Sequence, residues 1–291
     1  MKLFPFMSLL CFAMIVHLCS CSLLRREETY ELVFSRPYQV GYVYRSQHQC
    51  QVSAVIYSSD PDGQDEEVMQ QDLRILYDYQ IVSRGASVDN DVGELVILEV
   101  ESRGDDPMNA QSLEGAIIVI ETEYGLVRYL KNGNADLTEE ELQVLHLLYS
   151  GPLPASDDRI YSPEKPVSVG YRWGINREAY AQHFNSAGVI LSRIEAANIK
   201  GWVRLASVEK ERALVQSSVV VRENNLETQG LIREVETSIE EEIDLPLNPS
   251  HVSRRRAANI VTVTRLGAND GGIERLVVTM HLSTELVEIR Q

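Results

Sequence analysis

A repeated phrase constrains the fold of this chain more than any other feature of its sequence. Residues 36–44 read RPYQVGYVY and residues 165–173 read KPVSVGYRW, so the pattern basic-Pro-x-x-Val-Gly-Tyr-x-aromatic occurs twice. Proline suits the start of an edge strand, and glycine permits a close approach of backbone or ring. Two copies are too few for a solenoid. We therefore predict two related units that pack as a pseudo-symmetric pair.

Most of the remaining sequence has the alternation of apolar and polar residues that is typical of β-strands. Strands are predicted at 75–81 and 95–100, and further hairpins at 116–130, 202–221 and 260–282. Consecutive hairpins without long intervening helices favour antiparallel sheets. The predicted fold class is mainly β (α+β), with two tandem antiparallel curved-sheet domains and one well-specified helix in the first.

That helix is predicted to begin after Thr138. Thr138 and Glu141 have the spacing of a capping box, in which each side chain bonds the backbone N–H of the other residue. Leu137 and Leu142 occupy the positions of a hydrophobic staple. A second helix is predicted over 177–184 from an aromatic pair spaced four residues apart.

The segment 151–159, GPLPASDDR, has the composition of a linker and separates the two copies of the repeat. The predicted organisation is a signal peptide at 1–20, a tether at 21–30, a first β unit at 31–158 and a second at 159–291.

The first twenty residues have the pattern of an export signal. Lys2 precedes an apolar run over 3–18, which is shorter than the roughly 20 apolar residues that cross a bilayer. The run ends in Leu18, Cys19, Ser20 and Cys21, and this box resembles the cleavage site of bacterial lipoproteins. The resemblance implies cleavage before Cys21 and an acyl chain, such as palmitate, on that cysteine. Plain secretion with a cut near Ser20 or Ser22 is the alternative.

Together with the repeated phrase and the capped helix, this leader makes the chain similar to uncharacterised bacterial lipoproteins. The lipoprotein carriers LolA and LolB are an analogy of fold only. The resemblance implies a place in the cell envelope, at the outer membrane or its periplasmic face. If Cys21 carries lipid, the tether of about 30 Å holds the first unit close to the membrane.

Charge and cysteine content narrow the range of partners. The formal net charge of −16 argues against nucleic acid, whose recognition needs a basic patch. Behind the leader, Cys21 is followed by a single further cysteine, Cys50, in a strand-like run. We interpret Cys50 as a small buried hydrophobe. Were Cys21 not lipidated, a Cys21–Cys50 disulfide would be the alternative.

The sequence has no motif that carries catalytic chemistry. A Gly-x-Ser-x-Gly elbow, a His-Glu-x-x-His helix, a phosphate-binding glycine loop and a Cys-x-x-Cys pair are all absent, and the histidines are scattered. We therefore predict that the chain is not an enzyme and that it needs no metal and no other cofactor. An enzyme whose site forms only across the two units stays open as an alternative.

The predicted role is binding or structural. The candidate ligand-binding residues are the aromatic positions of the repeated phrase, namely Tyr42, Tyr44, Tyr171 and Trp173. Alternate residues of a strand share a face, so each pair could meet an apolar ligand or another envelope protein. Aromatic rings on one face of a strand usually belong to the core, so ordinary core packing is the alternative that this pattern favours over binding. The expected partners are the membrane, through the lipid anchor, and one such ligand or protein. A secreted β-protein with the same binding role is the alternative.

Overall fold

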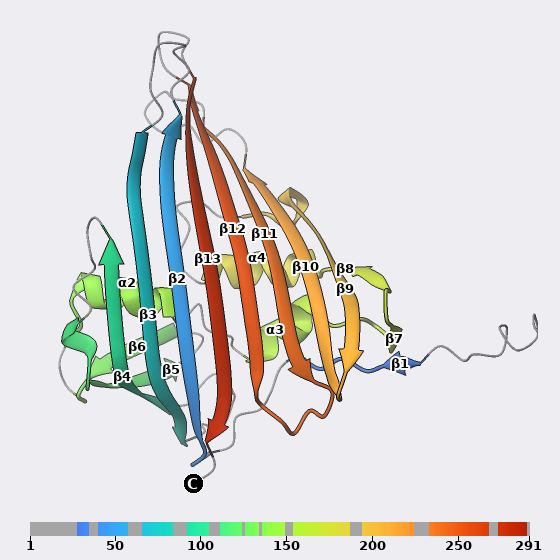
Figure 1. The fold of residues 1–291 in the computed structure, drawn as a ribbon, viewed down its shortest axis with the longest axis horizontal. Helices are drawn as coiled ribbons and strands as arrows, with labels where there is room; N and C mark the ends of the chain where they lie inside the picture. The colour runs from blue at the N-terminus through green and yellow to red at the C-terminus, as the bar shows by residue number, and fades with distance from the viewer. Residues whose placement is uncertain are drawn as a thin grey trace, which may run out of the picture.

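A large β-sheet with short helices on one side forms the core of the molecule (Figure 1). The computed structural model describes residues 28–34, 40–57, 66–83, 92–104, 111–123, 126–133, 136–148, 154–186, 194–223, 233–267 and 273–289. The predicted leader at 1–20 and Cys21 lie outside these ranges, so export and lipidation stay predictions.

Eleven antiparallel strands form the sheet, in the order β6-β5-β4-β3-β2-β13-β12-β11-β10-β9-β8. Those of the first unit are β2 (Val43–Tyr57), β3 (Glu66–Ser83), β4 (Val92–Gly104), β5 (Ile117–Glu123) and β6 (Leu126–Lys131). Those of the second are β8 (Arg172–Gly174), β9 (Ile199–Glu209), β10 (Arg212–Glu223), β11 (Arg233–Pro246), β12 (Arg254–Gly267) and β13 (Ile273–Ile289). The mainly β fold class with antiparallel pairing is confirmed.

The two predicted units meet within this sheet. β2 pairs with β13 from Val43 opposite Ile289 to Tyr57 opposite Arg275. Each unit runs in chain order across the sheet, so the last strand of the second unit lies beside the first strand of the first unit. The strands of 31–158 and of 159–291 therefore share one continuous hydrogen-bonded surface.

Local sequence signals define the hairpins. The β9–β10 turn contains Lys210 and Glu211, whose φ angles of 49° and 62° both lie in the left-handed region. Consecutive positive φ values match the right-handed twist of the flanking strands. The predicted pairings of β3 with β4, β5 with β6, β9 with β10 and β12 with β13 are all confirmed.

The capped helix is also confirmed, as α2 (Glu139–Leu148). Thr138 N–H donates to Glu141 Oε2 at 2.9 Å, and Glu141 N–H donates to Thr138 Oγ1 at 3.2 Å. Lys131 and Ser112 also donate to Glu141, at 2.5 and 2.6 Å. Burial would raise the pKa of Glu141, but these hydrogen bonds outweigh it and the pKa lies below its ordinary value.

The linker prediction for 151–159 is wrong from Pro154 onward. Pro154–Tyr161 forms helix α3, with proline at the first helical position, where its missing N–H costs nothing. The acidic residues that suggested a solvated linker have buried partners instead. Asp158 Oδ1 accepts from Phe34 N–H at 2.6 Å, and Asp157 pairs with Arg254. The predicted helix over 177–184 is confirmed as α4 (Arg177–Ser186).

The start of the described chain is attached to the second unit. β1 (Thr29–Tyr30) pairs with β7 (Val167–Ser168) in a separate two-stranded sheet. The predicted tether therefore ends in a strand. From Cys21 to Thr29 the chain advances eight residues, at most about 29 Å. A lipid on Cys21 would thus hold this edge of the second unit near the membrane, and not the first unit.

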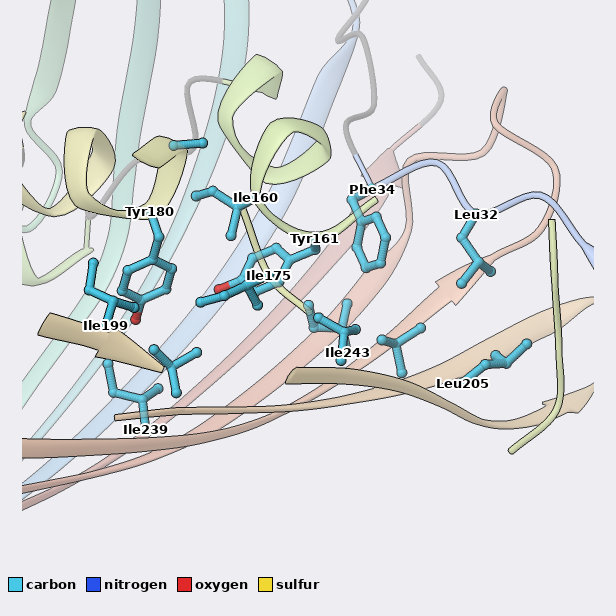
Figure 2. Close-up of a cluster of buried hydrophobic side chains, with 14 of the residues drawn as sticks. Leu32, Phe34, Ile160, Tyr161, Ile175, Tyr180, Ile199, Leu205, Ile239 and Ile243 are labelled. Carbon is cyan, nitrogen blue, oxygen red and sulfur yellow. The ribbon is translucent and has the colours of Figure 1, made fainter. Parts of the chain in front are cut away.

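Two apolar clusters lie under the helices. In one, α3 and α4 pack on β9, β10 and β11; Figure 2 shows Tyr161 and Tyr180 facing Ile199, Ile239 and Ile243. In the other, Val144 and Leu145 of α2 are fully buried among residues of β3, β4 and β5. We call the sheet surface that carries both clusters the helix face, and the opposite surface the open face.

Candidate functional site

The four aromatic residues chosen from the sequence lie in two separate places. Tyr44 is 1% exposed and packs with Val252 and Leu286 on the helix face, whereas Tyr42 is 42% exposed. Tyr171 and Trp173 stack with ring centroids 6.2 Å apart, and Trp173 Nε1 donates to the carbonyl of Tyr161. The two pairs are six strand positions apart, about 29 Å at the usual spacing. They therefore do not form one site.

The repeated phrase nevertheless has the same local geometry in both copies. Gly41 and Gly170 have φ angles of 82° and 89°, which a residue with a side chain rarely adopts. Gly41 N–H donates to the carbonyl of Ile81, and Gly170 N–H donates to that of Leu205. The glycines therefore turn the chain into β2 and β8 in the same way, which is a structural reason for the pattern.

Cys50 is buried on the helix face, at 6% exposure, opposite Leu73 and Leu282. Burial, with a smaller contribution from Asp72, raises the pKa of its thiol to about 11. The thiol is therefore protonated at neutral pH. This agrees with the prediction of a small buried hydrophobe.

A polar depression crosses the open face. It consists of three adjoining hollows of about 590, 410 and 420 Å³. Gln51 and His281 line both the first and the second hollow, Gln49 the first and third, and Asp72 and Arg103 the second and third. We call this continuous surface the trough. Its main open-face residues are Gln47, Gln49, Gln51, Asp72, Arg74, Glu101, Arg103, Trp202, Gln216, Ser218, Glu240, Glu242, Asn259, His281 and Ser283.

Strand alternation places these residues together. In β2, Gln47, Gln49 and Gln51 point to the open face, while His48 and Cys50 between them point to the helix face. The trough extends over neighbouring strands from β9 to β4, which is seven strand spacings or about 34 Å. None of these residues was a candidate from the sequence, although the alternating glutamines of β2 were a signal that could have revealed the trough.

Several polar atoms of the trough have partners, and others have none. Gln216 Nε2 donates to Glu242 at 2.8 Å, and Gln51 Nε2 donates to Asp72 at 3.4 Å. Among the described residues that line the trough on the open face, Asn259 Oδ1 and Arg74 Nε are buried atoms without a hydrogen-bond partner. Buried polar groups are nearly always paired, so these two atoms indicate a site that an additional partner would complete.

The helix face carries a cluster of buried charged side chains, separate from the trough. The side chain of Glu241 is 3% exposed, and it accepts hydrogen bonds from Arg256 Nε and, at 3.3 Å, from Ser217 Oγ. Asp157 of α3 lies 3.3 Å from Arg254 and 3.8 Å from Arg256. Burial would lower the pKa of Arg256, but the two carboxylates outweigh it and raise the pKa. Among the described ion pairs, the acidic run 240–242 and the basic run 254–256 are joined by the pair of Glu241 and Arg256.

His48 lies on the same face as this cluster and connects strands β13 and β3 through its ring nitrogens. Its Nδ1 lies 3.1 Å from Thr284 Oγ1, and its Nε2 lies 3.0 Å from Ser46 Oγ and 2.9 Å from the Tyr77 hydroxyl. Burial, and then the charge of Arg254, lower the pKa of His48 to about 4, so the ring is neutral at pH 7. Ser46 and Tyr77 are 2% and 7% exposed. We therefore interpret this group as structural, because a substrate could not reach it without a rearrangement.

Neither a metal-binding group nor a membrane-spanning helix is found in the described ranges. No group of three or more His, Cys, Asp or Glu side chains there is placed to hold a metal ion. In the same part of the chain, no helix combines the length and the apolar character needed to cross a membrane.

Comparison with known proteins assigns no family. No family model matches the chain, and no curated protein matches it. One similar solved structure is described as "Lipid-protein interactions in lipovitellin", with a TM-score of 0.43 and 10% identity over 87% of this chain. The chain spans only 26% of that lipovitellin chain. Another, described as "Asymmetric conductivity of engineered proteins", has a TM-score of 0.22 and 8% identity, covering 82% of this chain and 99% of that one.

Proposed function

We propose that this chain is an exported, lipid-anchored envelope protein that binds a polar ligand or partner in the trough without catalysing a reaction. The trough is the observation that carries the proposal. It joins three polar hollows over neighbouring strands and holds buried polar atoms that lack partners, as a preformed binding site does.

One further observation supports the absence of catalysis, and another supports a polar ligand. His48, the histidine whose pKa is displaced to about 4, lies on the helix face away from the trough. Two large parts of the apolar surface of the helix face are covered by the helices, one by α2 and the other by α3 and α4. An apolar ligand in the curved sheet therefore has less support than a polar ligand on the open face.

The lipid anchor is tested by Cys21→Ser in the full chain, expressed with its leader in a bacterial host. We expect the wild type to partition with membranes and its N-terminal peptide to carry the mass of acyl chains. Cys21→Ser should lose both, while the matched variant Cys19→Ser keeps both, because only Cys21 becomes the first residue after cleavage. A soluble, unmodified wild type would contradict the anchor and favour plain secretion.

The binding role is tested by filling the trough. Ser283 lines the first hollow on the open face of β13, and a tyrosine fits a strand surface. We expect Ser283→Tyr, and independently Ser218→Tyr, to weaken co-sedimentation of the detergent-purified full chain with isolated envelope material by at least about tenfold.

Val287→Tyr is the matched control, because Val287 is 45% exposed on the same face of the same strand, beyond the hollows. It should leave co-sedimentation unchanged. Equal retention of the wild type and both filled variants, with unchanged thermal unfolding, would show that the trough is not the binding surface.

A further inference from the structure

The shape of the trough limits the class of ligand. The first hollow crosses the strands from β9 to β2, and the second and third lie beside each other over β2 to β4, so that together they span about 34 Å across the sheet. A compact cofactor would be enclosed by a deep pocket. A long, shallow depression is better matched by an extended chain that lies across the strands.

The charges that face the trough limit the ligand further. Four carboxylates (Glu240, Glu242, Asp72 and Glu101) stand against two guanidinium groups (Arg74 and Arg103). This excess of negative charge opposes nucleic acids, polyphosphates and other polyanions. Three of the carboxylates have internal partners, since Glu242 accepts from Gln216, Asp72 accepts from Gln51 and Glu101 pairs with Arg103 at 3.7 Å. The surface therefore does not require a polycation, and a neutral chain fits it best.

The hydrogen-bonding side chains of the trough favour a ligand that carries hydroxyl groups. Amide side chains offer both donors and acceptors, and they recur at Gln49, Gln51 and Asn259. The unpartnered atoms are of both kinds, with an acceptor on Asn259 and a donor on Arg74. A hydroxyl donates one hydrogen bond and accepts others, so a polyhydroxylated chain can satisfy both kinds.

One aromatic side chain, Trp202, borders the trough at its β9 end. Trp202 lines the first hollow, and the guanidinium of Arg172 lies 4.0 Å from the centre of its ring. This cation–π contact fixes the indole in place. Its remaining apolar surface can pack against the C–H groups of a sugar ring, while the ring hydroxyls reach the amides beside it.

We infer that the trough binds a neutral glycan chain laid across strands β9 to β4. This inference rests on the proposed binding role and names the ligand for it. The trough supplies amides and carboxylates for sugar hydroxyls, and Trp202 supplies a contact for the sugar ring at its β9 end.

Isothermal titration calorimetry of the full chain in detergent tests the inference with four neutral probes: chitohexaose, cellohexaose, maltohexaose and dextran. At least one should bind, and Ser283→Tyr and Trp202→Ala should each weaken that binding by about tenfold or more. Val287→Tyr should bind as the wild type does. A twelve-residue Ser-Gly peptide and polyphosphate, the competing probes, should not bind.

The outcomes separate the ligand class from the binding role. Suppose that none of the four glycans binds at millimolar concentration, while Ser283→Tyr still removes co-sedimentation with envelope material. The glycan assignment is then overturned and the binding role stands. Binding of the Ser-Gly peptide in place of the glycans would likewise overturn the glycan assignment and leave the binding role standing. If Ser283→Tyr changes neither glycan binding nor co-sedimentation, both are overturned.

Discussion

Replacing Glu241 with alanine should lower the free energy of unfolding by about 3 kcal/mol, because it leaves a guanidinium on the helix face without its main partner. The side chain of Glu241 is 3% exposed and accepts from Arg256 and from Ser217. Removal of one member of a buried ion pair typically costs about 3–5 kcal/mol. We expect the lower end, because Arg256 keeps a longer contact with Asp157 and its side chain is 31% exposed. Urea unfolding at pH 7 measures the loss.

The double variant Glu241→Leu with Arg256→Met is the control for this prediction. Hydrophobic replacement of both partners often costs little, because neither charge is left buried. The double variant should therefore recover at least half of the stability that Glu241→Ala loses. A loss below about 1 kcal/mol in Glu241→Ala would mean that water already compensates Arg256 and that the ion pair contributes as little as a surface pair.

Acidification should destabilise the protein through His48. The pKa of His48 is about 4 in the folded protein and near 6.5 in the unfolded chain. Between these values the unfolded chain binds more protons, so stability falls as the pH falls from 6.5 to about 4. At about 1.36 kcal/mol for each pKa unit, the full loss is about 3 kcal/mol. Above pH 6.5 His48 contributes no pH dependence.

His48→Gln isolates this effect, because an amide keeps hydrogen-bonding groups near Thr284 and Tyr77 but does not titrate in this range. Urea unfolding at pH 7 and pH 5 should show a loss for the wild type that is about 2 kcal/mol greater than for His48→Gln. The interval stays above the range in which Glu141, whose pKa is lowered, begins to contribute. Equal losses in the two proteins would show that His48 titrates normally in the folded state.

Features encoded by neighbouring residues could be predicted from the sequence. The capping box at Thr138 and Glu141 specified α2, because both partners lie within one turn. The hairpins followed from alternation and turn composition. The glycines of the repeated phrase indicated a shared turn, and Gly41 and Gly170 have nearly the same φ.

Long-range features could not be predicted in this way. The pairing of β2 with β13 joins strands from opposite ends of the chain, and no local signal encodes it. Asp157 looked like a linker residue because its partner Arg254 is 97 residues away. The trough could not be predicted from the sequence because its residues come from eight strands. Each strand contributes only one to three of the main open-face side chains, and these are common on the surface of any sheet.

Site-specific photocrosslinking shows which surface of the sheet meets the ligand in the intact envelope. A benzophenone amino acid would replace Ser218 or Ser283 in the trough, or Val287 outside it. We predict adducts with envelope material from both trough positions and none from Val287. Adducts from Val287 alone, with unmodified protein at both trough positions, would contradict the assignment of the open-face trough as the binding site.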